Sequence, residues 1–184
     1  MIMFYEGGGR YRCTATLVTP TVLLTAAHCT MGTAGKTLVT FDSVIAEAPP
    51  SGIPAAADPA AGYVSSDVTK DPTRTWYAGQ SAYHPQYSDF TDMDNWNDVG
   101  VVVLDTPVTG VTPSKIAPLN YLDRFAQPKL NSTLFTIVGY GTEVRMIVTV
   151  TSYGYTQNCR YLDGLQRVDI KGVQSWLMGY GVMP

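Results

Sequence analysis

Charged side chains are scarce in this chain. They make up 15% of its 184 residues, whereas about 25% is usual for a soluble domain. The 12 basic and 15 acidic residues give a net charge of −3 and are scattered without a basic cluster, so nucleic acid is not expected as a partner. With 45% hydrophobic residues, the chain is long enough to bury a sizeable core in one or two small domains.

Long apolar runs are missing as well. No stretch of 18 apolar residues occurs, so we predict no transmembrane helix and no membrane partner. The first five residues are apolar, but Glu6 and three glycines follow. This start predicts a strand and a glycine turn rather than a signal peptide, which needs a basic region and a longer apolar core. We expect either that export signals were removed or that the chain begins inside a longer product.

Cysteine is rare, and its spacing excludes the common metal motifs. The three cysteines are Cys13, Cys29 and Cys159, with no C-x-x-C spacing. This pattern gives no zinc signature, and the odd number fits one disulfide plus one remaining thiol. In an exported protein, the remaining thiol indicates a partner outside this chain. We expect no cofactor.

Helical signals are sparse, and short strand-like runs dominate the chain. We predict strands at residues 12–18, 21–25, 36–45, 99–104, 134–138 and 145–153. Short helical turns are predicted only at residues 26–29 and 121–127. Many short strands separated by glycine and proline are typical of an all-β barrel or sandwich.

Two proline-rich segments organise the chain. Residues 46–62 hold four prolines among alanine, serine and glycine, which predicts an extended surface loop. Residues 107–118 hold three prolines between two apolar runs, which predicts a connector between domains. We therefore expect an N-terminal domain at residues 1–118 and a second unit at residues 119–184.

Of the two histidines, His28 is the better candidate for chemistry. It ends the apolar run LLTAAHC, and a histidine can act as a general base near neutral pH when a buried carboxylate orients it. Asp98 is the strongest candidate for that carboxylate, because it directly precedes the apolar run at residues 99–104. Asp92 and Asp94 lie farther out in a polar segment. We interpret His84 as a structural or surface residue.

A zinc site remains a weak alternative. His28, His84, Cys29 and Asp98 are possible ligands by residue type, but they have no ligand spacing.

Four motifs occur in the order found in one protease family. They are TLVTPTVLLTAAHC, YHPQY, NDVGVVVLDTPV and IVGYGT, at residues 16–29, 83–87, 97–108 and 137–142. Together they resemble the histidine motif, the His-Pro-x-Tyr segment, the aspartate motif and the Gly-Trp-Gly-Thr stretch of the chymotrypsin-like (trypsin family) serine proteases. The resemblance implies two antiparallel six-stranded Greek-key barrels, of which the second is incomplete in this chain.

The resemblance also implies roles for four residues. His28 would be the general base of a serine endopeptidase, and Asp98 would orient it. Cys13 and Cys29 match the disulfide beside the histidine, which requires an oxidising compartment. A secreted monomer that acts on a protein or peptide substrate, without metal or cofactor, is the expected setting.

The nucleophile of that family is missing from these residues. The chain contains no Gly-Asp-Ser sequence, and the family template places the serine about 93 residues after the aspartate, which is beyond Pro184. His28 and Asp98 are 70 residues apart, against about 45 in the template, and residues 46–62 could supply most of the excess. We therefore expect the chain as given to be inactive. A non-catalytic, protein-binding homologue and a fragment without its own function are the alternatives.

Overall fold

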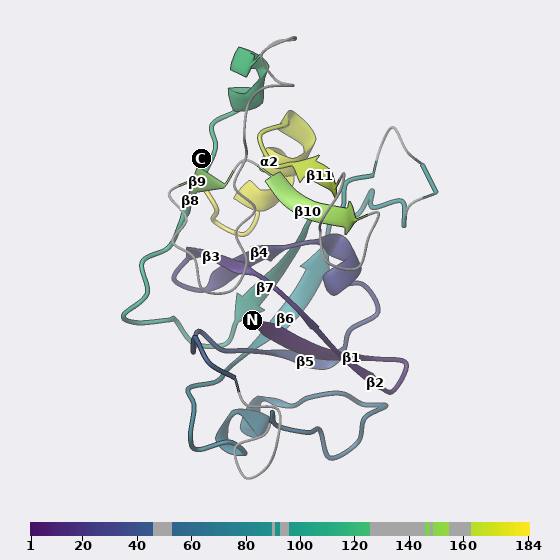
Figure 1. Ribbon diagram of the computed structural model, residues 1–184, viewed down its shortest axis with the longest axis vertical. Coiled ribbons are helices and arrows are strands. Elements are labelled where there is room, and N and C mark those ends of the chain that lie inside the picture. Colours follow the sequence, from purple (N-terminus) through teal and green to yellow (C-terminus); the bar gives the residue numbers. More distant parts are fainter. Residues whose placement is uncertain (46–52, 90, 93–95, 126–145, 148, 155–162) are drawn as a thin grey trace.

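The structure is a computed structural model and describes residues 1–45, 53–89, 91–92, 96–125, 146–147, 149–154 and 163–184. Strands dominate these residues, and they contain a single α-helix (Figure 1). The prediction of an all-β chain is therefore confirmed. The predicted strand at residues 134–138, the IVGYGT motif and Cys159 lie outside the described residues.

The largest element is a curled, antiparallel sheet of seven strands. Its order is β2-β1-β5-β6-β7-β4-β3. The strands are β1 (Ile2–Glu6), β2 (Gly9–Cys13), β3 (Thr16–Thr19), β4 (Val22–Thr25), β5 (Ala34–Val39), β6 (Tyr77–Tyr83) and β7 (Gly100–Leu104). β1 and β2 form a hairpin around Gly7 and Gly8, which both have positive φ angles. This is the strand and glycine turn expected from the start of the sequence.

The predicted strands differ from the observed ones at their ends. The run at residues 12–18 is divided between β2 and β3, because Thr14 and Ala15 interrupt the pairing. The strand predicted over residues 36–45 ends at Val39, and residues 40–45 are not in a strand. β6 was not predicted, because its alanine, glycine, serine and glutamine have little intrinsic strand preference.

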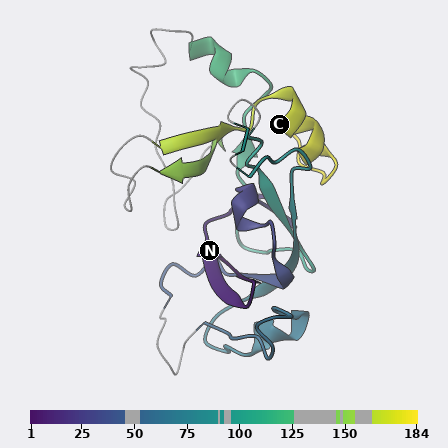
Figure 2. The same ribbon diagram turned by 90° about the vertical axis from the view of Figure 1, so that its right-hand side faces the viewer.

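The remaining elements lie together at one end of the molecule (Figures 1 and 2). They are β8 (Lys115–Ile116) and β9 (Met146–Ile147), which pair in parallel, the antiparallel pair β10 (Thr149–Gly154) and β11 (Asp163–Arg167), and helix α2 (Lys171–Met178). The described residues also form three short 3₁₀ helices, η1 (Ala27–Cys29), η2 (Ser65–Thr69) and η3 (Tyr121–Phe125). The first and third agree with the two predicted helical turns. Among the described residues, no helix has the length and apolar character needed to cross a membrane.

Helix α2 packs on the large sheet and was not predicted from the sequence. Val173 and Leu177 are fully buried in one apolar cluster with Val22 and Val101 of strands β4 and β7. The helix has only eight residues and no side-chain cap at its N-terminus. An isolated helix of this length is unstable in water, so packing against the sheet must stabilise it.

His84 joins the sheet to α2 and is buried, as the structural interpretation required. His84 is only 4% exposed. The centre of its ring lies 5.4 Å from that of the Trp176 ring in an edge-on arrangement. The backbone N–H of Gln86 donates to its Nδ1 at 3.2 Å. Burial lowers the pKa of His84 below its ordinary value, against the opposing effect of a hydrogen bond to the backbone at Gly172.

This lowered pKa predicts that acid weakens the fold. The unfolded chain takes up a proton at His84 near pH 6.5, whereas the folded chain binds it only at lower pH. The contribution of neutral His84 to the free energy of unfolding is therefore fully present above pH 6.5 and is lost as the pH falls below that value. We expect the free energy of unfolding, measured with denaturant between pH 7 and pH 5, to fall more steeply in the wild type than in H84Q. Parallel pH curves for the two proteins would contradict this expectation.

The segment at residues 53–76 contributes several buried side chains to a cluster on the sheet. Ala56, Tyr63 and Trp76 are buried in one apolar cluster with Met3 of β1 and Leu38 of β5. This part of the chain lies at the end of the molecule opposite to α2 (Figure 1). The predicted surface loop is observed over residues 53–62: no strand or helix occurs there, and Ala55 and residues 57–61 are exposed, although Pro54 and Ala56 are buried. Residues 46–52 of the predicted loop lie outside the described residues.

Candidate active site

The candidate base follows a fully buried strand. β4 ends at Thr25, and Ala26 and Ala27 are 3% and 0% exposed, so the chain enters η1 inside the core. The hydroxyl of Thr30 donates to the carbonyl of Ala27 at 3.0 Å and holds this turn. The side chain of His28 itself is 37% exposed. Small buried residues therefore fix the backbone while the imidazole reaches the surface.

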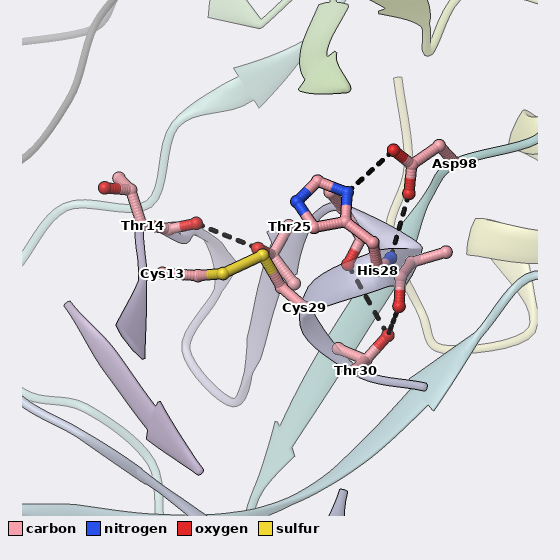
Figure 3. The surroundings of a disulfide bond; sticks show 9 residues. Cys13, Thr14, Thr25, His28, Cys29, Thr30 and Asp98 are labelled. Atoms are coloured by element: carbon pink, nitrogen blue, oxygen red, sulfur yellow. Dashed lines mark hydrogen bonds and ion pairs between the residues drawn. A yellow bond between two sulfur atoms is a disulfide. The ribbon is translucent and has the colours of Figure 1, made fainter. Parts of the chain in front are cut away.

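Asp98 holds both the backbone and the ring of His28. Its Oδ1 accepts a hydrogen bond from the backbone N–H of His28 at 2.9 Å, and its Oδ2 lies 2.9 Å from Nδ1 of the ring (Figure 3). Asp98 is 0% exposed and lies just before β7. Because a carboxylate accepts hydrogen bonds, this geometry favours a proton on Nδ1 and leaves Nε2 of the neutral ring as an acceptor.

The predicted disulfide is present beside the pair. Cys13 at the end of β2 is bonded to Cys29 of η1, with their Cα atoms 6.2 Å apart (Figure 3). The hydroxyl of Thr25 donates to the carbonyl of Thr14 at 2.8 Å and ties the same two segments together. The two cysteines are 16 residues apart. In the chain-entropy description, closing a loop of this length adds about 3 kcal/mol to the free energy of unfolding. The bond therefore keeps the backbone of His28 in place.

The same residues do not form a metal site in the oxidised protein. Ligand atoms of Cys13, His28 and Cys29 all lie within 4.8 Å of one another. Both sulfur atoms are bonded to each other in the disulfide, whereas a cysteine binds a metal through its free thiolate. The alternative zinc set fares no better, because His84 is turned toward Gln86 and Trp176 and Asp98 is engaged with His28.

One residue near the pair was missed by the sequence analysis. The backbone N–H of Asp98 donates to Oε1 of Gln166 in β11 at 3.2 Å. Gln166 lies 68 residues away, and nothing in its local sequence connects it to the aspartate motif. Only the fold could reveal this contact.

Comparisons with known proteins place these observations in context. The family model described as Trypsin matches residues 1–177. The scabies mite inactivated protease paralogue S-I1 is similar in structure, with 14% identity and a TM-score of 0.52 over 97% of this chain and 91% of that one. The scabies mite inactivated protease paralogue S-D1 is also similar, with 11% identity and a TM-score of 0.54 over 100% of this chain and 93% of that one. A Glu endopeptidase shares 14% identity with this chain and has a TM-score of 0.49 over 98% of this chain and 88% of that one.

No curated protein matches the sequence. At these low identities, the likeness to the solved structures concerns the fold.

Proposed function

Because the chain belongs to the trypsin family of serine proteases, we propose that His28 and Asp98 are two members of the catalytic triad of a serine endopeptidase. The observation that carries the proposal is that one buried carboxylate contacts both the backbone N–H and the ring Nδ1 of His28. The fold of the family, with its second barrel only partly present, is the one described above. The comparisons support the fold, whereas the roles of the two residues are our inference.

In the proposed mechanism, Nε2 of His28 takes the proton of a seryl hydroxyl as that oxygen attacks the carbonyl carbon of a peptide bond. The same nitrogen then gives the proton to the leaving amine, and water later hydrolyses the acyl-enzyme by the reverse proton route. Asp98 stays ionised, holds the ring in one tautomer and stabilises the imidazolium. The serine and the oxyanion donors would come from a Gly-Asp-Ser-Gly segment that these 184 residues do not contain.

A second candidate function is binding without catalysis. Two proteins of similar fold are named as inactivated protease paralogues. The 184 residues of this chain contain no Gly-Asp-Ser sequence. In this alternative, the chain recognises a protein partner through the surface around His28.

The wider setting is proposed on the same grounds. We take residues 1–118 as the N-terminal barrel and residues 119–184 as part of the second barrel, with β8 pairing across the boundary to β9. The disulfide and the family fit a secreted protein that acts as a monomer on protein or peptide substrates.

A fluorophosphonate probe that acylates activated serines tests the proposal. We expect intact mass spectrometry to show no probe adduct on the oxidised 184-residue chain, because it lacks the nucleophile. A form of the protein that also carries Gly-Asp-Ser-Gly should take up one equivalent, and H28A in that form should abolish the uptake.

Labelling of the 184-residue chain would overturn the prediction of inactivity. A form that carries the motif, folds and still fails to react would favour the binding alternative. A chymotrypsin-like protease labelled in parallel controls for the activity of the probe.

A further inference from the structure

Gln166 links the second barrel to the candidate catalytic pair. Its Oε1 accepts a hydrogen bond from the backbone N–H of Asp98 at 3.2 Å, and the carboxylate of Asp98 in turn holds His28. We propose that Gln166 is a positioning residue, which lets strand β11 set the orientation of Asp98 and thereby of His28. This inference rests on the proposed function of the pair.

The orientation of the Gln166 amide is fixed by its two neighbours. Its Nε2 donates to the carbonyl of Arg167 at 3.0 Å, while its Oε1 faces the N–H of Asp98. Rotating the amide by half a turn would set two donors against each other and two acceptors against each other. The side chain is therefore held in the one orientation that presents an acceptor to Asp98.

The backbone that follows Gln166 is held by an ion pair between Arg167 and Asp169. The Nε of Arg167 lies 2.8 Å from Oδ1 of Asp169, and its Nη2 lies 2.9 Å from Oδ2 of the same carboxylate. The second of these oxygens also accepts from the backbone N–H of Leu122, and Asp169 is 0% exposed. Two-point contacts between arginine and a buried carboxylate are strong and geometrically specific. Strand β11 thus offers a rigid support for the side chain of Gln166.

The chain needs such a support just before Asp98. Asn97 has a φ angle of 46°, which is in the left-handed region that residues other than glycine occupy at a cost. A backbone in this conformation persists only when its surroundings hold it, and the bond from Asp98 to Gln166 is one such hold. A shift of about 1 Å at a catalytic group can lower a rate about a hundredfold, so the hold matters for the geometry of His28.

Two matched substitutions test the proposal on the chain as it exists. Q166M keeps the length of the side chain and removes the acceptor. Q174M is the control, because Gln174 also donates a hydrogen bond to the first part of the chain, from Nε2 to the carbonyl of Ala117 at 2.7 Å, but does so on α2. Amide hydrogen exchange of Asp98 and long-range ¹H–¹⁵N spectra of the His28 ring are measured for both.

We expect the Asp98 amide to exchange about tenfold faster in Q166M, since one hydrogen bond is lost, and the ring of His28 to lose its preference for a proton on Nδ1. Q174M should leave both signals unchanged even where it lowers overall stability.

Equal exchange of Asp98 in the wild type and in Q166M would overturn the positioning role while leaving the catalytic pair intact. If the wild type itself shows no preferred proton on Nδ1, the proposed function of His28 and Asp98 fails instead.

Discussion

Replacing Asp98 by alanine is expected to lower the free energy of unfolding by about 3 kcal/mol and to free the ring of His28. The substitution removes the acceptor of the His28 backbone N–H and the partner of Nδ1 in one step. It does so at a position that is 0% exposed, where a polar group left without a partner costs about 1–3 kcal/mol. Unfolding by denaturant, followed by fluorescence, measures the change.

Two other substitutions make this result specific. D98N keeps the volume and one acceptor oxygen, so we expect a smaller loss of stability. In a form that carries the serine motif, however, we expect turnover to fall about ten-thousandfold. D92A removes an exposed acid from the same region and should change stability by no more than about 0.5 kcal/mol. Equal stability of D98A and D92A would contradict the structural part of the prediction.

The contact of His28 with Asp98 and the disulfide of Cys13 with Cys29 could be predicted from the sequence, because each of these residues stands in a short local motif. The apolar run before His28 with Cys29 after it, and Asp98 before the apolar strand β7, are short sequence patterns that can be recognised in a single chain. Small residues are required there by the fold: an added Cβ at Gly100 would lie 2.4 Å from the hydroxyl oxygen of Thr30. Packing of this kind restricts the residues allowed at each position, and the restriction is readable as a motif.

The parts that were missed depend on contacts between distant segments. Helix α2 exists because Val173 and Leu177 find an apolar surface on the sheet, and eight residues alone carry too little helical signal. Gln166 is an ordinary glutamine in its own strand, and its partner lies 68 residues earlier. The composition of residues 53–62 predicted their loop, but not that Tyr63, at 0% exposure, anchors its end to the sheet.

That anchor gives the second prediction with a large effect, G62A. Gly62 has a φ angle of 76°, and a Cβ there would lie 1.9 Å from the carbonyl oxygen of Ala34. The contact is reciprocal, since a Cβ on Gly35 would lie 2.4 Å from the carbonyl oxygen of Tyr63. That same oxygen accepts a hydrogen bond from the N–H of Lys36 at 2.7 Å. The two backbones therefore approach so closely at this point that only glycine fits.

We expect G62A to lower the free energy of unfolding by about 3–4 kcal/mol, because it adds the cost of a left-handed alanine to that of pushing two backbones apart. G110A is the matched control: Gly110 has a φ angle of 80°, but a Cβ there would meet nothing within 4 Å. It should cost only about 1 kcal/mol. Equal losses in the two variants would mean that φ alone sets the cost, and that the segment at residues 53–62 does not need its close contact with β5.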